Sequence, residues 1–128
     1  MKKIVCAMCL SVMICVQPVF AEVSPTLIED ALYSVLFPQI NQAIQKHYGI
    51  QKRYDCPKIV SLKREYPGTY VFEATIEVIK YEEPVDSKPQ PPFDRILITF
   101  NNEEGEWMVK SMNVQRLPNN TKLTCQKK

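Results

Sequence analysis

The clearest pattern of apolar and polar residues in the chain runs from Thr69 to Tyr81. Apolar side chains there alternate with polar ones, and most are aromatic or β-branched, which is typical of a strand with one buried face. Ile79 and Tyr81 add apolar residues to the polar side. This predicts either a β-bulge near Val78–Ile79 or cover on both faces at this end of the strand. The expected inward residues are Tyr70, Phe72, Ala74, Ile76 and Val78, and the outward ones are Glu73, Thr75 and Glu77.

Residues 25–48 have the three- and four-residue spacing of an amphipathic helix. Ser24 is a preferred N-cap, Pro25 suits the first helical position, and Gly49 suits a helix end. Pro38 cannot donate a hydrogen bond to the carbonyl of Ser34, so we expect one kinked helix or two helices in tandem. The predicted apolar face consists of Leu27, Ile28, Ala31, Leu32, Val35, Leu36, Ile40, Ala43, Ile44, His47 and Tyr48.

Three further strands are predicted from shorter patterns, over residues 59–66, 95–100 and 107–116. The first should join the central strand through a loop of three to five residues at Pro67-Gly68. Four prolines between residues 82 and 93 predict a long surface loop there. In the strand over 95–100 the expected inward residues are Ile96, Ile98 and Phe100. In the last strand Met108, Met112 and Val114 are expected on one face, with Trp107 and Val109 on the opposite face.

These elements predict a single α+β domain over residues 22–116, in which a kinked N-terminal helix packs on a four-stranded antiparallel meander. The arrangement is similar to cystatin-like and cone-like folds. Alternating polar residues predict that one face of the sheet is open to water. Residues 117–128 are polar and lack periodicity, so we expect a C-terminal tail.

The first 21 residues have the features of a secretory signal peptide. Lys2 and Lys3 precede an apolar run that is too short to span a bilayer, and small residues precede Glu22. We therefore expect cleavage between Ala21 and Glu22, a secreted or envelope location, and no stable membrane anchor after cleavage. An uncleaved anchor is the alternative.

Removal of this segment changes both the charge and the cysteine count. The whole chain has 16 Lys and Arg and 14 Asp and Glu, so the two counts become equal without Lys2 and Lys3. A neutral chain has no net attraction for nucleic acid or anionic lipid. Three of the five cysteines also leave, and the two that remain, Cys56 and Cys125, are expected to form a disulfide in an oxidising compartment. Two unpaired thiols are the alternative.

The order of these elements resembles a known family. A helix ending in Tyr-Gly, the segment KIVSLKREYPGTYVFEATIEV, a proline-rich stretch and the strand ILITF are similar to small secreted proteins of Gram-positive spore formers. That family is catalogued as domain of unknown function 3888, and the resemblance covers about residues 27–114. The most telling pieces are residues 72–78, 91–93 and 98–100. The resemblance implies secretion and a shared fold, and it implies no reaction.

Few residues suggest catalysis or cofactor binding. His47 is the only histidine, and a cap on the helix end explains it. Glu73 and Glu77 share the outward face of the central strand, with their Cα atoms about 13 Å apart, which is wide for a glycosidase pair. No zinc-type ligand set, phosphate-binding glycine loop or nucleic-acid ladder is present, so no cofactor is expected.

The leading hypothesis is a non-catalytic binding domain whose partner is a protein or an envelope component. Its contact surface would be the open sheet face rimmed by the proline-rich stretch, which also contains a PxxP match at residues 89–92. A small hydrolase or ligand-binding domain with a helix–sheet pocket is one alternative, and a cystatin-like protease inhibitor is another. The residues proposed for the surface are Tyr81, Phe93, Trp107, Pro91 and Pro92, with Tyr70 as a further aromatic.

Overall fold

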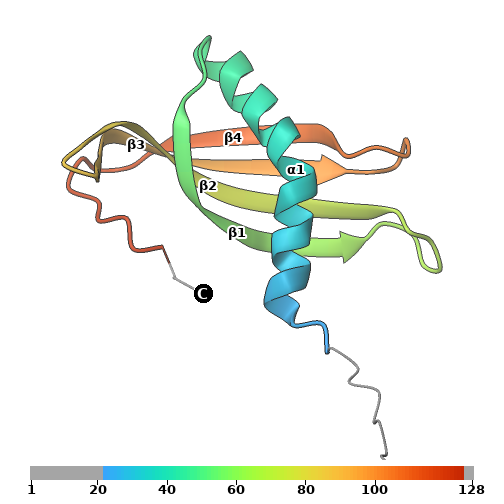
Figure 1. Ribbon diagram of the computed structural model, residues 1–128. Helices are drawn as coiled ribbons and strands as arrows, with labels where there is room; N and C mark the ends of the chain where they lie inside the picture. The colour runs from blue at the N-terminus through green and yellow to red at the C-terminus, as the bar shows by residue number, and fades with distance from the viewer. Residues whose placement is uncertain (1–21, 126–128) are drawn as a thin grey trace, which may run out of the picture.

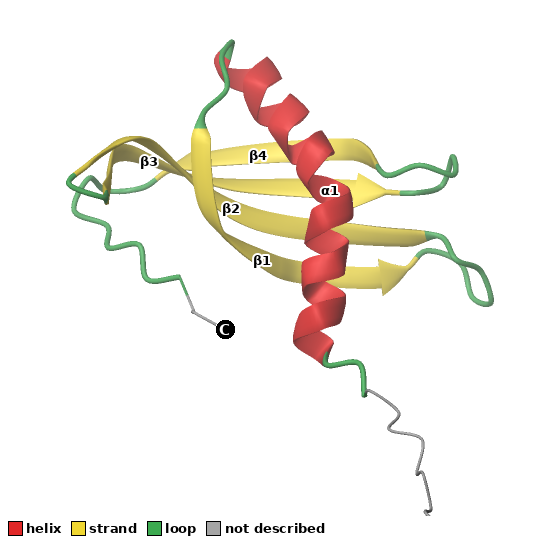
Figure 2. Cartoon of the chain, in the orientation of Figure 1, coloured by secondary structure: helices red, strands yellow, loops and turns green. Residues whose placement is uncertain are grey.

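The computed structural model describes residues 22–125, and the predicted signal peptide lies outside the described residues. One helix crosses one face of a four-stranded antiparallel sheet, which confirms the α+β meander (Figures 1 and 2). Among the described residues, no helix combines the length and hydropathy that a membrane span requires. The elements are α1 (Pro25–Tyr48), β1 (Arg53–Arg64), β2 (Phe72–Val85), β3 (Lys88–Asn101) and β4 (Met108–Arg116), and the strand order is β1-β2-β3-β4.

The helix α1 begins and ends where the capping residues predicted. The side chain of Ser24 accepts a hydrogen bond from the backbone N–H of Leu27 (3.2 Å), and Gly49 adopts the left-handed conformation that a helix end favours. Pro38 lies inside a continuous helix. The predicted apolar face is only partly buried: Tyr33, Leu36, Ile40 and Ile44 enter the core, whereas Leu27, Ile28 and Val35 are exposed. The first turns of α1 project past β1, so no sheet lies beneath them (Figure 1).

The strands β1 and β2 pair with two irregularities. The register shifts between Asp55 and Lys58 and again between Ile59 and Ser61, and in both places β1 has the extra residue. The first bulge lies opposite Val78, and Val78, Ile79 and Lys80 are all buried. The strand β2 keeps its register with β3 from Val78 to Lys80, so the bulge lies in the partner strand β1 and the predicted cover on both faces of this end of β2 is confirmed. The strand β1 also begins earlier than predicted, at Arg53, and ends at Arg64.

The proline-rich stretch forms a hairpin, so the predicted loop over residues 82–93 is wrong. The strands β2 and β3 extend to Val85 and from Lys88, and they are joined by Asp86 and Ser87, which both have positive φ as in a type I′ turn. The prolines are compatible with these strands because they lie at positions that do not pair between β2 and β3. Pro91 and Pro92, joined by a cis peptide bond, lie where β3 has extra residues between the pairs Lys80↔Asp94 and Glu82↔Gln90. Proline lacks a backbone donor and is tolerated at such unpaired positions.

A bulge in β4 changes which residues face the helix. Met112 pairs with Ile98 and Val109 pairs with Phe100, so Lys110 is the extra residue and the alternation reverses there. Val109 therefore lies on the same face as Met112 and Val114, and Trp107 packs against the core. The prediction that Trp107 and Val109 lie on the opposite face is wrong.

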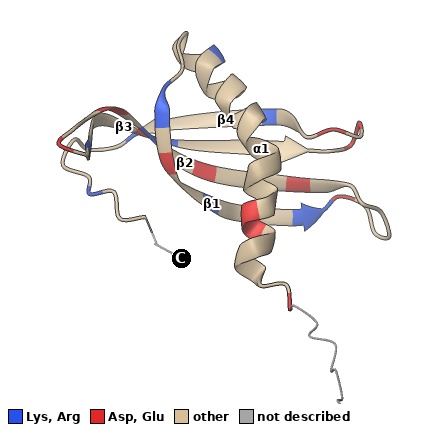
Figure 3. Cartoon of the chain, in the orientation of Figure 1, with Lys and Arg blue, Asp and Glu red and all other residues tan. Residues whose placement is uncertain are grey.

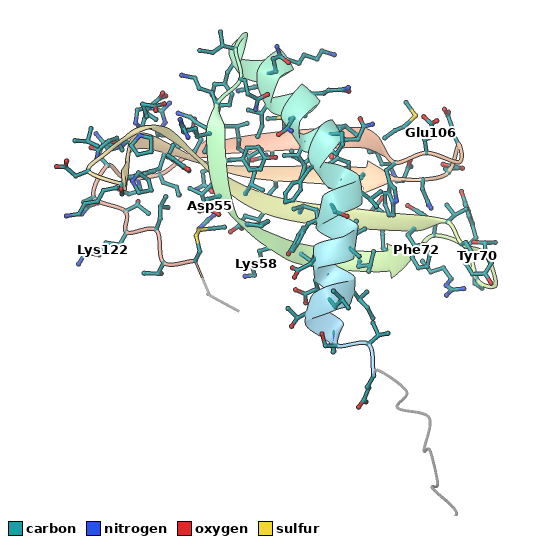
Figure 4. All side chains as sticks on the ribbon, in the orientation of Figure 1. Asp55, Lys58, Tyr70, Phe72, Glu106 and Lys122 are labelled. Carbon is teal, nitrogen blue, oxygen red and sulfur yellow. A yellow bond between two sulfur atoms is a disulfide. The ribbon has the colours of Figure 1, made fainter. Side chains whose placement is uncertain are left out.

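The core lies between α1 and the inner face of the sheet. It contains Ile76 and Val78 from β2, and it contains Ile96, Ile98 and Phe100 from β3, as the alternation predicted. Tyr70 was also expected to face inward, but it lies before β2 in the β1–β2 loop and is 85% exposed (Figure 4). Glu65 and Val71 close that loop through a backbone hydrogen bond of 2.9 Å, which leaves five residues between them, as the predicted length allowed.

The C-terminal segment is irregular but attached to the sheet. The N–H of Leu117 donates to the carbonyl of Phe93 (2.9 Å), and Cys125 forms a disulfide with Cys56, with Cα atoms 4.9 Å apart. Cys56 lies in the first bulge of β1 with φ of 58°, and its N–H donates to Asp55. The tail therefore returns to β1, as the pairing of the two cysteines predicted.

Candidate functional site

The structure does not bring the five predicted surface residues together. Phe93 is 3% exposed, Tyr81 is half-buried opposite Arg53, and Pro91 and Pro92 lie beside Phe93 on β3. Trp107 lies at the other end of the sheet, because β4 begins beside Asn101 and ends beside Asp94. The sequence suggested one aromatic surface because it gave no register. The register keeps Tyr81 opposite residues 91–93 and separates only Trp107 from them along the strands.

His47 and the two outward glutamates lie on opposite faces of the sheet. His47 is exposed in the last turn of α1, with its ring 4.7 Å from the ring of Tyr48. Glu73 and Glu77 point away from α1, where Lys110 and Lys63 bind Glu73 and Arg95 approaches Glu77. The hydrogen bonds from Lys110 and Lys63 lower the pKa of Glu73 to about 2. The sheet therefore separates His47 from both glutamates.

A buried charge cluster, which the sequence analysis missed, lies where the hairpin meets the end of α1. Lys80 and Asp94 face each other across β2 and β3, and both are almost fully buried. The ammonium of Lys80 donates to Glu82 (2.9 Å) and to the carbonyl of Pro92 (3.0 Å), and it lies 3.6 Å from Asp94 Oδ2.

The remaining bonds of this cluster come from other elements. The hydroxyl of Tyr48 on α1 donates to Asp94 Oδ2 (2.6 Å), Arg116 Nε donates to Asp94 Oδ1, and Lys52 Nζ donates to Glu82 (3.0 Å). Every buried charge therefore has a partner of opposite sign, which is the condition under which buried charges are tolerated. We conclude that this cluster joins α1, β2, β3 and β4.

The cluster shifts the acidity of three of its groups. Burial and the hydrogen bond to Asp94 raise the pKa of Tyr48 far above its usual value. Burial alone would raise the pKa of Asp94, but the hydrogen bonds from Tyr48 and Arg116 and the charge of Lys80 outweigh it, so the pKa of Asp94 lies below its usual value. Hydrogen bonds from Lys80 and Lys52 lower the pKa of Glu82.

These lowered pKa values predict a loss of stability in acid. The unfolded chain binds protons on Asp94 and Glu82 near pH 4, whereas the folded protein binds them only at lower pH. The free energy of unfolding should be highest above the unfolded pKa values and fall as the pH drops through the folded ones. Urea unfolding between pH 3 and pH 7 measures this. An Asp94→Asn variant should show a shallower decline, and an identical decline would contradict the assignment.

An exposed groove on the helix side of the sheet lies between the second half of α1 and β4, and we call it the α1–β4 groove. Its volume is about 670 Å³, which lies in the range of ligand sites. Met108 and Val109 are 48% and 38% exposed there. Charged residues are sparse along α1 (Figure 3). The groove is lined by Gln39, Gln42, Ala43, Lys46, His47, Met108, Val109 and Met112.

A second groove, of about 850 Å³, lies at the bulge of β1 beside the disulfide. The first half of α1 forms one wall and the tail forms another, and Figure 4 shows the disulfide next to the bend of β1 near Asp55. Its lining mixes both signs of charge, with Asp30 and Asp55 opposed to Lys58 and Lys122. Among the described residues, no three His, Cys, Asp or Glu side chains are placed to share a metal ion.

Comparison with known families decides the relationship of this chain. A family model described as "Protein of unknown function (DUF3888)" matches residues 28–115, which is more than half of the chain. The chain belongs to this DUF3888 family. No curated protein and no solved structure matches the chain.

The match shows which features lie inside the DUF3888 domain. The domain contains every residue of the α1–β4 groove and, except for Arg116, every residue of the buried charge cluster. Cys56 lies inside the matched residues and Cys125 lies outside them. The tail and its disulfide therefore extend beyond the part of the chain that the family model describes.

Proposed function

We propose that this DUF3888 protein is a secreted, non-catalytic binding module that engages a partner protein at the cell envelope or outside the cell through the α1–β4 groove. The secreted location rests on residues 1–21, whose basic start, short apolar run and small residues before Glu22 are typical of a signal peptide.

The exposed apolar floor of the groove carries this proposal. Val109 and Met112 face the helix side of the sheet but lie near its β4 edge, where α1 leaves an open groove over them. Exposed apolar side chains rimmed by polar ones mark interaction sites on soluble proteins. Gln39, Gln42 and Lys46 provide such a rim.

The charge arrangement supports binding over catalysis. Asp94 and Lys80 are the most buried charged residues in the described part of the chain, and each of them is bound by a partner from a neighbouring strand. His47, which would be the general base of the hydrolase alternative, faces the groove together with glutamines, methionines and a lysine. A base needs a partner or a bound substrate within about 3 Å, and no carboxylate lines this groove.

Capture of the partner tests the proposal. A protein spanning residues 22–128 contains the whole described fold and serves as bait on cell-surface extracts and culture medium. Val109→Asp places a charge in the groove and should reduce the retained partner at least about tenfold, because disruption of a central interface position costs about 2 kcal/mol or more and about 1.4 kcal/mol is a factor of ten. Val85→Asp, at another exposed valine that lies on the hairpin and outside the groove, is the control and should retain the partner. Equal retention by both variants would overturn the groove assignment.

A further inference from the structure

We propose that the ligand of the α1–β4 groove is an extended peptide segment of the partner, which adds to β4 as a fifth strand and carries a carboxylate. This inference rests on the proposed function and specifies its mode of binding. It depends on the edge of the sheet, the position of α1 and the charges that line the groove.

The two edges of the sheet differ in how well they can accept another strand. The edge strand β1 has two bulges, a proline at Pro57 and a disulfide at Cys56, and such devices block strand addition. The other edge strand, β4, has one bulge at Lys110, and its register then continues without a shift from Ser111 to Arg116. The free edge of β4 is therefore the regular one.

The hydrogen bond between Leu117 and Phe93 shows which backbone N–H and C=O groups of β4 point away from β3 and are open to an added strand. The N–H of Leu117 donates to Phe93, and Arg116 pairs with Asp94 in the same register. Because bonded and non-bonded pairs alternate in an antiparallel ladder, Ser111, Asn113 and Gln115 direct their backbone groups toward β3. Met112 and Val114 then direct their N–H and C=O groups outward, and no described residue accepts or donates a bond there.

The end of α1 lies on one side of the space that a fifth strand would occupy next to β4, and it leaves that space open. Its last turns extend beyond β4 in Figure 1, and Ala43 and Lys46 line the groove from above. A strand added to β4 would lie next to the last turns of α1. Every second side chain of this strand would then pack against Val109 and Met112. Addition to a sheet edge beside a helix gives affinity through main-chain bonds and specificity through alternate side chains.

The charges of the groove define the chemistry of the segment. Lys46 and His47 line it, whereas no acidic residue does. Lys46 makes no ion pair with any described residue, since every described ion pair involves other groups. Complementarity with this basic rim calls for a carboxylate on the segment near the end of α1. The ligand is thus an extended chain with alternating apolar residues and an acidic group.

A phage-displayed library of random octapeptides, selected on immobilised protein of residues 22–128, tests the inference. We expect enriched sequences with alternating apolar residues and an acidic residue. A selected peptide should slow the amide exchange of Met112 and Val114 at least about tenfold, because their outward N–H groups become bonded. Lys46→Glu should weaken its binding, and an unchanged affinity would contradict the charge assignment.

Backbone methylation of the selected peptide provides the sharper control. Only alternate residues of an added strand direct their N–H groups toward β4. Methylation of one alternate set should weaken binding about tenfold or more, and methylation of the other set should leave it unchanged. Equal effects of both sets, exchange protection elsewhere, or a dimer that itself covers β4 in solution would overturn the strand-addition mode. If partner capture still depends on Val109 in that case, the groove remains the binding site; if capture also fails to depend on Val109, the proposed function fails.

Discussion

Replacement of Lys80 by alanine should lower the free energy of unfolding by about 3–5 kcal/mol. The ammonium of Lys80 is bound by Glu82, Asp94 and the carbonyl of Pro92, and its side chain is almost completely buried. The change removes the central cation of the cluster and also leaves the volume of its buried stem empty, which adds a cavity cost. Urea unfolding at pH 7, followed by circular dichroism, measures the loss.

Two companion variants separate the causes of this loss. Lys80→Met keeps the length of the side chain, so its cost should reflect the missing charge and be smaller than that of Lys80→Ala. Lys63→Ala removes a lysine that binds Glu73 on the exposed face and should cost no more than about 1 kcal/mol. If Lys80→Ala costs as little as Lys63→Ala, the cluster does not hold the hairpin to the helix.

The sequence predicted the helix and the central strands well because local chemistry defines them. Ser24 and Gly49 fix the ends of α1 by capping, and alternation over residues 72–78 fixes which face of β2 is buried. These signals depend only on neighbours within a few positions. The pairing of Cys56 with Cys125 followed from counting, since only two cysteines remain after the predicted signal peptide.

The errors arose where register decides the structure. The single extra residue at Lys110 reverses which side chains of β4 face the helix, and no local sequence pattern predicts this bulge. The prolines at residues 84–92 predict a break in the strands, but a proline at an unpaired position removes no hydrogen bond from the ladder. The hairpin turn at Asp86 and Ser87 has no glycine to signal it.

The candidate sites were harder to predict than the fold because they depend on contacts between distant residues. In the sequence, Lys80 has the position of a polar residue in an alternating strand. Only the structure, in which Tyr48 and Asp94 lie next to it, shows that it is a buried cation. Its neighbours Ile79 and Tyr81 gave the one local signal, since they indicated cover on both faces. The α1–β4 groove depends on both the bulge at Lys110 and the position at which α1 crosses the sheet. No local sequence pattern predicts either feature.

Loss of the disulfide should have the second large effect. Cys56 and Cys125 are 69 positions apart, and a crosslink over that distance restricts the unfolded chain by up to about 4 kcal/mol. The Cys56→Ser, Cys125→Ser double variant should therefore unfold at a lower urea concentration by an amount that corresponds to about 2–4 kcal/mol. Reduction of the unchanged protein should produce the same shift, and intact mass confirms the loss of the bond in each sample.

Deletion of the tail can show whether the disulfide stabilises the protein by restricting the unfolded chain or by holding the tail on the folded one. Leu117 and Leu123 line the second groove together with Ile79, so the tail forms one wall of this groove next to β2 in the folded protein. Deletion of residues 118–128 removes the crosslink together with Leu123, and it should cost more than the double serine variant if these contacts stabilise the fold. Equal costs would assign the whole effect to the unfolded chain. A double serine variant as stable as the unchanged protein would show that the crosslink contributes nothing, and the attachment of the tail would then depend on its contacts alone.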